Sequence, residues 1–111
     1  MKNIFEKLTH QMTEAIEAAI SLALHNQNAE VEVVHFLWAQ LSNSNSILSQ
    51  VFNKMNMDKT AIELEIKSAS NKFPKSSQLT KENIRLSRDF AQSLEAAESW
   101  MIQNGVSFIA V

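Results

Sequence analysis

Two stretches of the chain repeat each other without a gap, and this internal repeat limits the possible folds more than any other feature. Residues 8–33 align with residues 86–111, so that EAA at 17–19 meets EAA at 95–97, Met12 meets Phe90 and Ile16 meets Leu94. A repeat of this length indicates two copies of one supersecondary unit that bury their apolar faces against each other.

The second copy ends early. In the first copy the repeat continues directly into an apolar segment, whereas residues 34–72 have no counterpart after Val111. We therefore expect a truncated second repeat, with a short protein that ends here naturally as the alternative. The expected divisions of the single domain at 1–111 are a first repeat at about 4–73, a linker at about 74–79 and the start of a second repeat at about 80–111.

Turn-forming residues are scarce, with one glycine and one proline in 111 residues. A β protein needs such residues at short intervals, so the composition favours long helices joined by polar loops. The hydrophobic share of 45% and the charged share of 20% are those of an ordinary globular domain. The predicted fold class is all-α, a pseudo-twofold tandem repeat of a helical bundle.

Apolar residues three or four positions apart predict five helices. Residues 33–42 are apolar nearly all round, which favours a buried helix, although the β-branched start leaves a strand as the alternative. Asp58 and Thr80 are predicted N-caps, and Pro74 is expected to end the fourth helix. The predicted helices lie at 4–25, 33–42, 47–55, 58–73 and 80–104.

Four of these helices, the two long ones and the third and fourth, have a predicted apolar side, which usually faces a core. The third helix groups its apolar residues on one side, and the fourth repeats them at i, i+4, i+7 and i+11. The residues concerned are Ile47, Leu48, Val51, Phe52 and Met55 in the third helix, and Ile62, Ile66, Ala69 and Phe73 in the fourth.

Catalytic and cofactor motifs are not found. A phosphate-binding loop needs several glycines, and Gly105 stands alone. There is no cysteine, and the three histidines lack partners at metal-ligand spacing. We expect a non-catalytic domain without a metal or cofactor of its own. His35 is expected to be a structural histidine that bonds a helix end, in preference to a catalytic one.

The charge distribution bears on partners and location. The net charge is −2, yet half of the basic residues fall within 72–88, as Lys72, Lys75, Lys81, Arg85 and Arg88. This run is either a nucleic-acid patch or a solvated linker and helix face. The second interpretation is preferred because no aromatic residues interleave. No signal peptide or membrane span is recognisable, which predicts a cytoplasmic chain without a membrane partner.

The two long helices, the N-x-x-V/I connector and the apolar helix resemble the N-terminal repeat domain of the Clp ATPases. In this sequence the pattern is LT…EAIEAAISLAL…VEVVHFL, and the FEKLT opening is most similar to the disaggregase subfamily ClpB. Two positions depart from the family pattern, because Val34 replaces the usual glutamate before the histidine and Val106 replaces an aspartate. The resemblance covers essentially the whole chain.

This resemblance implies a function. Such a domain caps a hexameric AAA+ ring through a flexible linker and engages exposed apolar segments of unfolded or aggregated proteins in a groove between the repeats. ATP and Mg²⁺ would then belong to the rest of the parent chain, and a DnaK-type co-chaperone is a further expected partner. The alternatives are an adaptor-docking or substrate-docking domain of a Clp protease ATPase (ClpA-like or ClpC-like), or a nucleic-acid-binding helical domain.

The resemblance also implies a set of client-binding residues on the two long helices. Thr9 matches a threonine tied to chaperone function, with an N-terminal helix cap as the alternative role. Leu94 matches an apolar position that lines the groove. Trp100 is either a client contact or a core residue. The expected set is Thr9, Met12, Ala15, Phe90, Leu94 and Trp100.

Overall fold

The computed structural model describes residues 2–103, apart from the side chains of residues 2–9, 11, 98 and 100–102. Five helices and two two-residue strands make up this part of the chain, which confirms the predicted, predominantly helical fold. The elements are α1 (Lys2–His25), β1 (Glu30–Val31), α2 (Val33–Ser42), α3 (Ile47–Lys54), α4 (Lys59–Ser70), β2 (Arg85–Leu86) and α5 (Arg88–Gln103).

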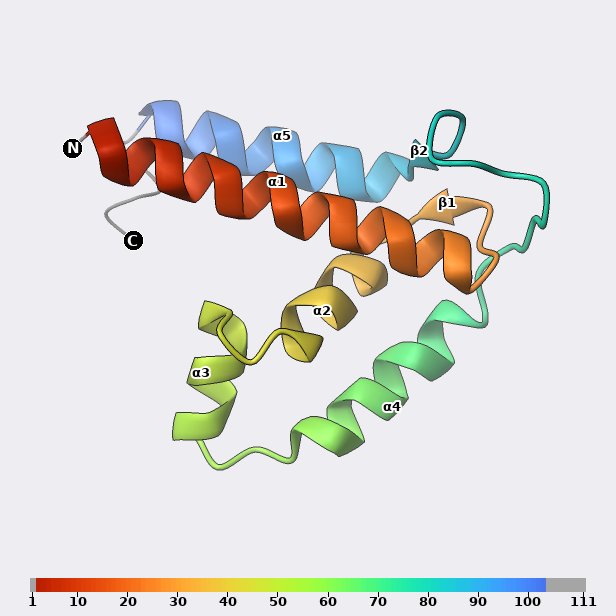
Figure 1. The fold of residues 1–111 in the computed structure, drawn as a ribbon, viewed down its shortest axis with the longest axis horizontal. Coiled ribbons are helices and arrows are strands. Elements are labelled where there is room, and N and C mark those ends of the chain that lie inside the picture. The colour runs from red at the N-terminus through yellow and green to blue at the C-terminus, as the bar shows by residue number, and fades with distance from the viewer. Residues whose placement is uncertain (1, 104–111) are drawn as a thin grey trace.

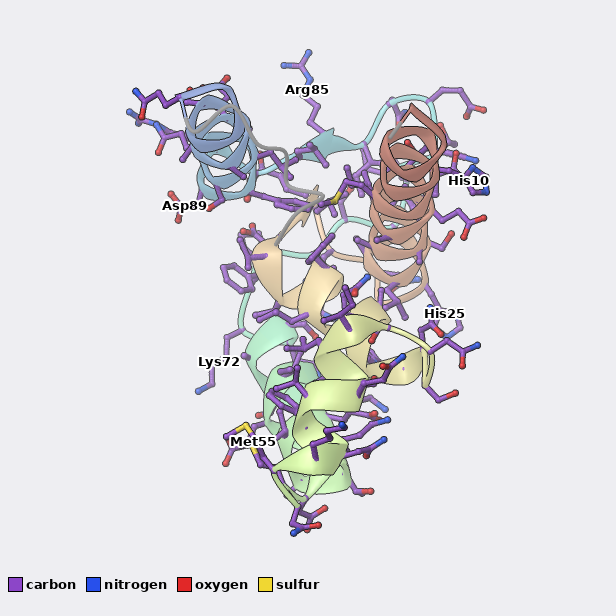
Figure 2. All side chains as sticks on the ribbon, turned by 90° about the vertical axis from the view of Figure 1, so that its left-hand side faces the viewer. His10, His25, Met55, Lys72, Arg85 and Asp89 are labelled. Carbon is purple, nitrogen blue, oxygen red and sulfur yellow. The ribbon has the colours of Figure 1, made fainter. Side chains whose placement is uncertain are left out.

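The two long helices, α1 and α5, lie at the same side of the molecule and are separated from each other. Figure 1 shows α1 and α5 running in opposite directions along the top, with α2, α3 and α4 below them. In Figure 2, which looks along the long axis, α1 and α5 occupy the two upper corners. The molecule measures only 20 Å along its shortest axis, so most helices keep one side in solvent.

A small core joins the long helices at their base. Ala19 and Ala23 of α1 are buried together with Val31 of β1 and Phe90 of α5. The Phe36 ring of α2 packs on Phe90, with ring centroids 5.7 Å apart and an interplanar angle of 56°. The small alanines allow α2 to pack close to α1, and α2 also contacts α3 and α4.

Local signals explain where most helices begin and end. The Asp58 carboxylate accepts a hydrogen bond from the Ala61 backbone N–H, so the predicted N-cap of α4 is confirmed. After α1, the Gln27 N–H donates to the Leu24 carbonyl and the Asn28 N–H donates to the Ala23 carbonyl. This is a Schellman motif, and Gln27 takes its left-handed position with φ of 57°.

The start of α5 differs from the prediction. The helix begins at Arg88 and not near Thr80, because the Ser87 hydroxyl accepts the Phe90 backbone N–H and caps it. Residues 80–84 form a turn instead. Arg85 and Leu86 then pair in parallel with Glu30 and Val31. A strand pairing therefore occupies the residues that would have extended the helix.

The end of α4 also differs from the prediction. The helix stops at Ser70 and not at Pro74, and Phe73 lies beyond it as an exposed side chain. The reason lies outside α4, because the side chain of Asn28 binds the Ser70 carbonyl oxygen at 2.8 Å. Pro74 instead supplies a carbonyl oxygen to the Ala29 N–H at 2.8 Å.

The orientation of α3 corrects a third expectation. Its apolar side does not face the core as a whole, because Ile47, Val51 and Met55 are exposed while Leu48 and Phe52 are half-buried. The fully buried residue of this helix is Ser49. Its hydroxyl lies 3.0 Å from the carbonyl oxygen of Gln40 and 3.2 Å from that of Leu41. Hydroxyl contacts to the end of α2 thus decide which side of α3 faces inward.

Candidate functional site

The expected client-binding residues fall into three groups. Phe90 is 3% exposed and Ala15 is buried, so both are core residues in this conformation. Met12 on α1 and Leu94 on α5 are half-buried, and Leu94 packs against the cluster around Phe90. The side chains of Thr9 and Trp100 lie outside the described part of the structure.

The backbone at Thr9 nevertheless excludes one of its two interpretations. Thr9 lies about two turns inside α1, which begins at Lys2, so it does not cap that helix. Its repeat partner Ser87 does cap α5. The same repeat position therefore has different structural roles in the two long helices.

The junction between the two repeats is built from adjoining helix starts. Glu32 is the N-cap residue of α2 and Ser87 is that of α5. The Ser87 N–H donates to the Val31 carbonyl at 2.8 Å, and the Ser87 hydroxyl also bonds the Glu32 carboxylate. Burial raises the pKa of the Glu32 carboxyl, the Ser87 hydrogen bond opposes this, and the negative charges of Glu30 and Asp89 add to it.

A buried polar network lies under this junction, centred on His35 and Asn28. The His35 side chain is fully buried, and its Nδ1 accepts the Glu32 backbone N–H at 2.8 Å. Nε2 must then carry the hydrogen, which it donates to Asn28 Oδ1 at 2.9 Å. This geometry requires a neutral ring. Burial and, to a lesser extent, the Lys75 charge lower the pKa of His35 to about 4.

Asn28 connects this histidine to the end of α4. Its Nδ2 donates to the Ser70 carbonyl at 2.8 Å, and its Oδ1 also accepts from Asn26 Nδ2 at 2.8 Å. Asn26 Nδ2 lies 3.1 Å from both the Ser70 hydroxyl and Asn71 Oδ1. Every polar atom of the buried Asn28 side-chain amide thereby has a hydrogen-bond partner. Asn28 therefore connects the end of α1, the start of α2 and the end of α4. The expectation that His35 is structural and bonds a helix end is confirmed.

Two kinds of site were sought among the described residues, a metal site and a membrane-spanning helix. No group of three or more His, Cys, Asp or Glu side chains in this part could hold a metal ion. In the same part of the chain, no helix is both long and apolar enough to cross a bilayer. The basic residues at 72–88 are exposed, and Lys75 Nζ binds the Asn26 carbonyl oxygen at 2.8 Å. What the molecule does present is apolar surface on helices.

Comparison with known proteins places the chain. The family model of the Clp repeat (R) N-terminal domain matches residues 7–111. The chain belongs to this family. The resemblance to this family is thereby confirmed.

Three relatives carry the same printed name, Chaperone protein ClpB. That of Helicobacter hepaticus is 52% identical over 98% of this chain, and that of Wolinella succinogenes is 54% identical over 98%. That of Bacillus cereus is 35% identical over 61%. The chain spans 13% of the length of the first two relatives and 8% of the third.

Sequence reasoning missed Ser87, Asn28 and Ser49, but two of them carried a signal. Ser87 aligns with Thr9, whose alternative predicted role is a helix cap, and the apolar residue Phe90 follows three positions after Ser87. Asn28 lies in the run HNQN, where side-chain amides compete for backbone partners and favour a loop. Nothing local distinguishes Ser49, which lies inside α3, from the serines of the loop before that helix.

Proposed function

We propose that the chain is the client-recognition domain of an ATP-dependent protein disaggregase. It engages exposed apolar segments of unfolded or aggregated proteins, which then pass to the hexameric ATPase ring of the parent protein. The observation that carries this proposal is the match to two chaperones named ClpB over nearly the whole chain. The domain itself does no catalysis, and ATP and Mg²⁺ act elsewhere in the parent. An unfolded client supplied by a DnaK-type chaperone fits the same scheme.

The proposed contact surface lies between the two long helices. Met12 and Leu94 are half-buried apolar residues on α1 and α5, so each has exposed area to offer, and Leu94 packs on the cluster around Phe90. Thr9 and Trp100 are proposed members at the far end of this surface. Ala15 and Phe90 are buried, so both would reach a client only if the packing around them opened. Recognition by apolar contact tolerates many client sequences and depends little on salt.

The test is binding of a labelled, permanently unfolded polypeptide, followed by fluorescence anisotropy. Leu94→Asp is expected to weaken binding about tenfold or more, because it places a charge in the apolar contact. The neighbouring exposed Glu95→Gln is the matched control and should bind like the wild type. Circular dichroism melting confirms that both variants fold. Unchanged affinity of a folded Leu94→Asp variant would refute the proposed surface.

The second candidate is adaptor docking in a Clp protease ATPase, which the same fold would serve. It predicts binding to a folded adaptor through a polar face, with an affinity that falls as salt rises. The relatives described above have the name Chaperone protein ClpB and not that of a Clp protease ATPase, which favours the first candidate. A nucleic-acid-binding domain ranks third, and a steep salt dependence of DNA or RNA binding would be its signature.

A further inference from the structure

A line of exposed apolar side chains runs along α3, on the side turned away from α2. Ile47 is 67% exposed, Val51 is 43% exposed and Met55 is 63% exposed. Residues four positions apart lie on one side of a helix, so these three form a continuous ridge. We call them the α3 ridge. Figure 2 shows Met55 at the opposite end of the molecule from His10 of α1 and Asp89 of α5.

The ridge is held in its outward orientation by hydrogen bonds on the opposite side of the helix. The Ser46 hydroxyl donates to the Gln40 carbonyl at 2.6 Å and also caps α3 by accepting the Ser49 N–H at 3.1 Å. The Ser49 hydroxyl is fully buried against the carbonyl oxygens of Gln40 and Leu41. Rotating α3 to bury the ridge would leave these polar groups without hydrogen-bond partners, which is unfavourable for buried groups. These hydrogen bonds therefore keep the ridge exposed in the described part of the chain.

The size of the ridge limits what can cover it. Three aliphatic side chains, each about half exposed, make a patch on the order of 300 Å², at the lower end of functional apolar patches. A stable complex buries about 800 Å² on each partner. A second copy of the chain, or a folded protein docked through the ridge alone, would therefore gain too little. A short apolar segment of an unfolded polypeptide needs no larger area.

The chemistry of the ridge also suits a variable occupant. Its three side chains carry no charge and no hydrogen-bonding group, so it selects for apolarity and not for a particular sequence. Met55 is flexible and polarizable, a property typical of surfaces that bind many partners. Met57, which follows the left-handed Asn56, is also exposed, at 40%.

We propose that the α3 ridge is a second docking surface for short apolar segments of unfolded polypeptides, separate from the surface between α1 and α5. This inference rests on the proposed function and adds to it. Two separated apolar contacts on one domain let a single client chain bind at two points, and the second contact raises the overall affinity through effective concentration.

The experiment compares matched surface variants of the 111-residue chain. Ile47→Ser removes one exposed aliphatic side chain from the ridge, and Leu64→Ser removes one from α4 that is 63% exposed. The probe is a fluorescein-labelled polypeptide kept unfolded by reduction and alkylation of its cysteines. Ile47→Ser should weaken binding about threefold and Ile47→Ser with Val51→Ser about tenfold, whereas Leu64→Ser should bind like the wild type.

Four other results would overturn the inference in distinguishable ways. Wild-type affinity of the double ridge variant, with Leu94→Asp still weakened, removes the ridge and leaves the proposed function intact. Equal weakening by Leu64→Ser and Ile47→Ser shows a general effect of surface apolarity. Sedimentation showing a wild-type dimer and a monomeric ridge variant assigns the ridge to a second copy. A wild-type chain that does not bind the probe removes both proposals.

Discussion

Acidification from pH 7 to pH 5 should destabilise the chain through one side chain, His35. In the folded state its ring is neutral, because Nδ1 accepts the Glu32 N–H while Nε2 donates to Asn28. A proton added at Nδ1 would point at the Glu32 N–H, so the hydrogen bond between these two groups at the start of α2 would be lost. The folded state therefore resists a proton that the unfolded chain accepts readily.

The sign and size of the effect follow from the two pKa values. The pKa of His35 is about 4 in the fold and 6.5 in the unfolded chain. The stabilisation is fully present above pH 6.5 and is lost as the pH falls toward 4, because only the unfolded state gains the proton in that window. Between pH 7 and pH 5 the loss is about 2 kcal/mol. This is a large part of the stability of a small domain.

Glu32 contributes with the opposite sign and has to be separated from His35. Its raised folded-state pKa means that the fold takes up a proton at higher pH than the unfolded chain, so acidification above pH 4.5 stabilises through this group. A His35→Gln variant keeps the Glu32 contribution and removes that of His35. The difference between wild type and variant therefore isolates the histidine.

The assay is urea unfolding followed by circular dichroism at several pH values between 5 and 7.5. The free energy of unfolding of the wild type should fall by about 2 kcal/mol more than that of His35→Gln. A variant at the exposed His25, His25→Gln, controls for removal of a histidine as such. Parallel curves for the wild type and His35→Gln would refute the reasoning, as would a His35 proton resonance that titrates near 6.5.

Three further substitutions test the structure. Asn28→Ala should lower the free energy of unfolding by about 3 kcal/mol, since it leaves buried partners of three segments unpaired; a loss below 1 kcal/mol in urea unfolding would contradict this. Gln27→Gly should raise stability by about 0.5–1 kcal/mol because φ is 57° there, and an unchanged or lower melting temperature would count against it. Ser87→Ala should cost about 1 kcal/mol, and hydrogen exchange should show the loss at the first turn of α5; unchanged exchange there would contradict the cap.

Local patterns predicted the elements that local forces determine. The helix at 33–42 and the Asp58 cap follow from apolar spacing and capping chemistry, and both are confirmed. The repeat offered one further signal, because Gln27 aligns with Gly105. A glycine at that position in one copy indicates the left-handed backbone that Gln27 adopts in the other.

The features that the sequence did not predict depend on contacts between segments that are distant in the chain. The apolar side of α3 gives no hint that Ser49 would take the buried position, because the pattern counts apolar residues and not the neighbours available to cover them. The end of α4 depends on Asn28, which is 42 positions away from Ser70. The sequence predicts that α1 and α5 form the two sides of the candidate site. It does not predict that Phe90 is buried and Leu94 partly exposed, because both depend on the packing of α2.

Two sets of contacts, the Asn28 network and the pairing of β1 with β2, join segments at different positions in the chain, and these positions imply an order of assembly. The Asn28 network joins α1, α2 and α4 within the first 74 residues, whereas the pairing of Glu30 with Arg85 waits for residues that are synthesised later. Loop closure is faster for nearer segments. On a ribosome the Asn28 network can therefore form before α5 is synthesised, and Phe90 of α5 then completes the core with Ala19, Ala23 and Val31.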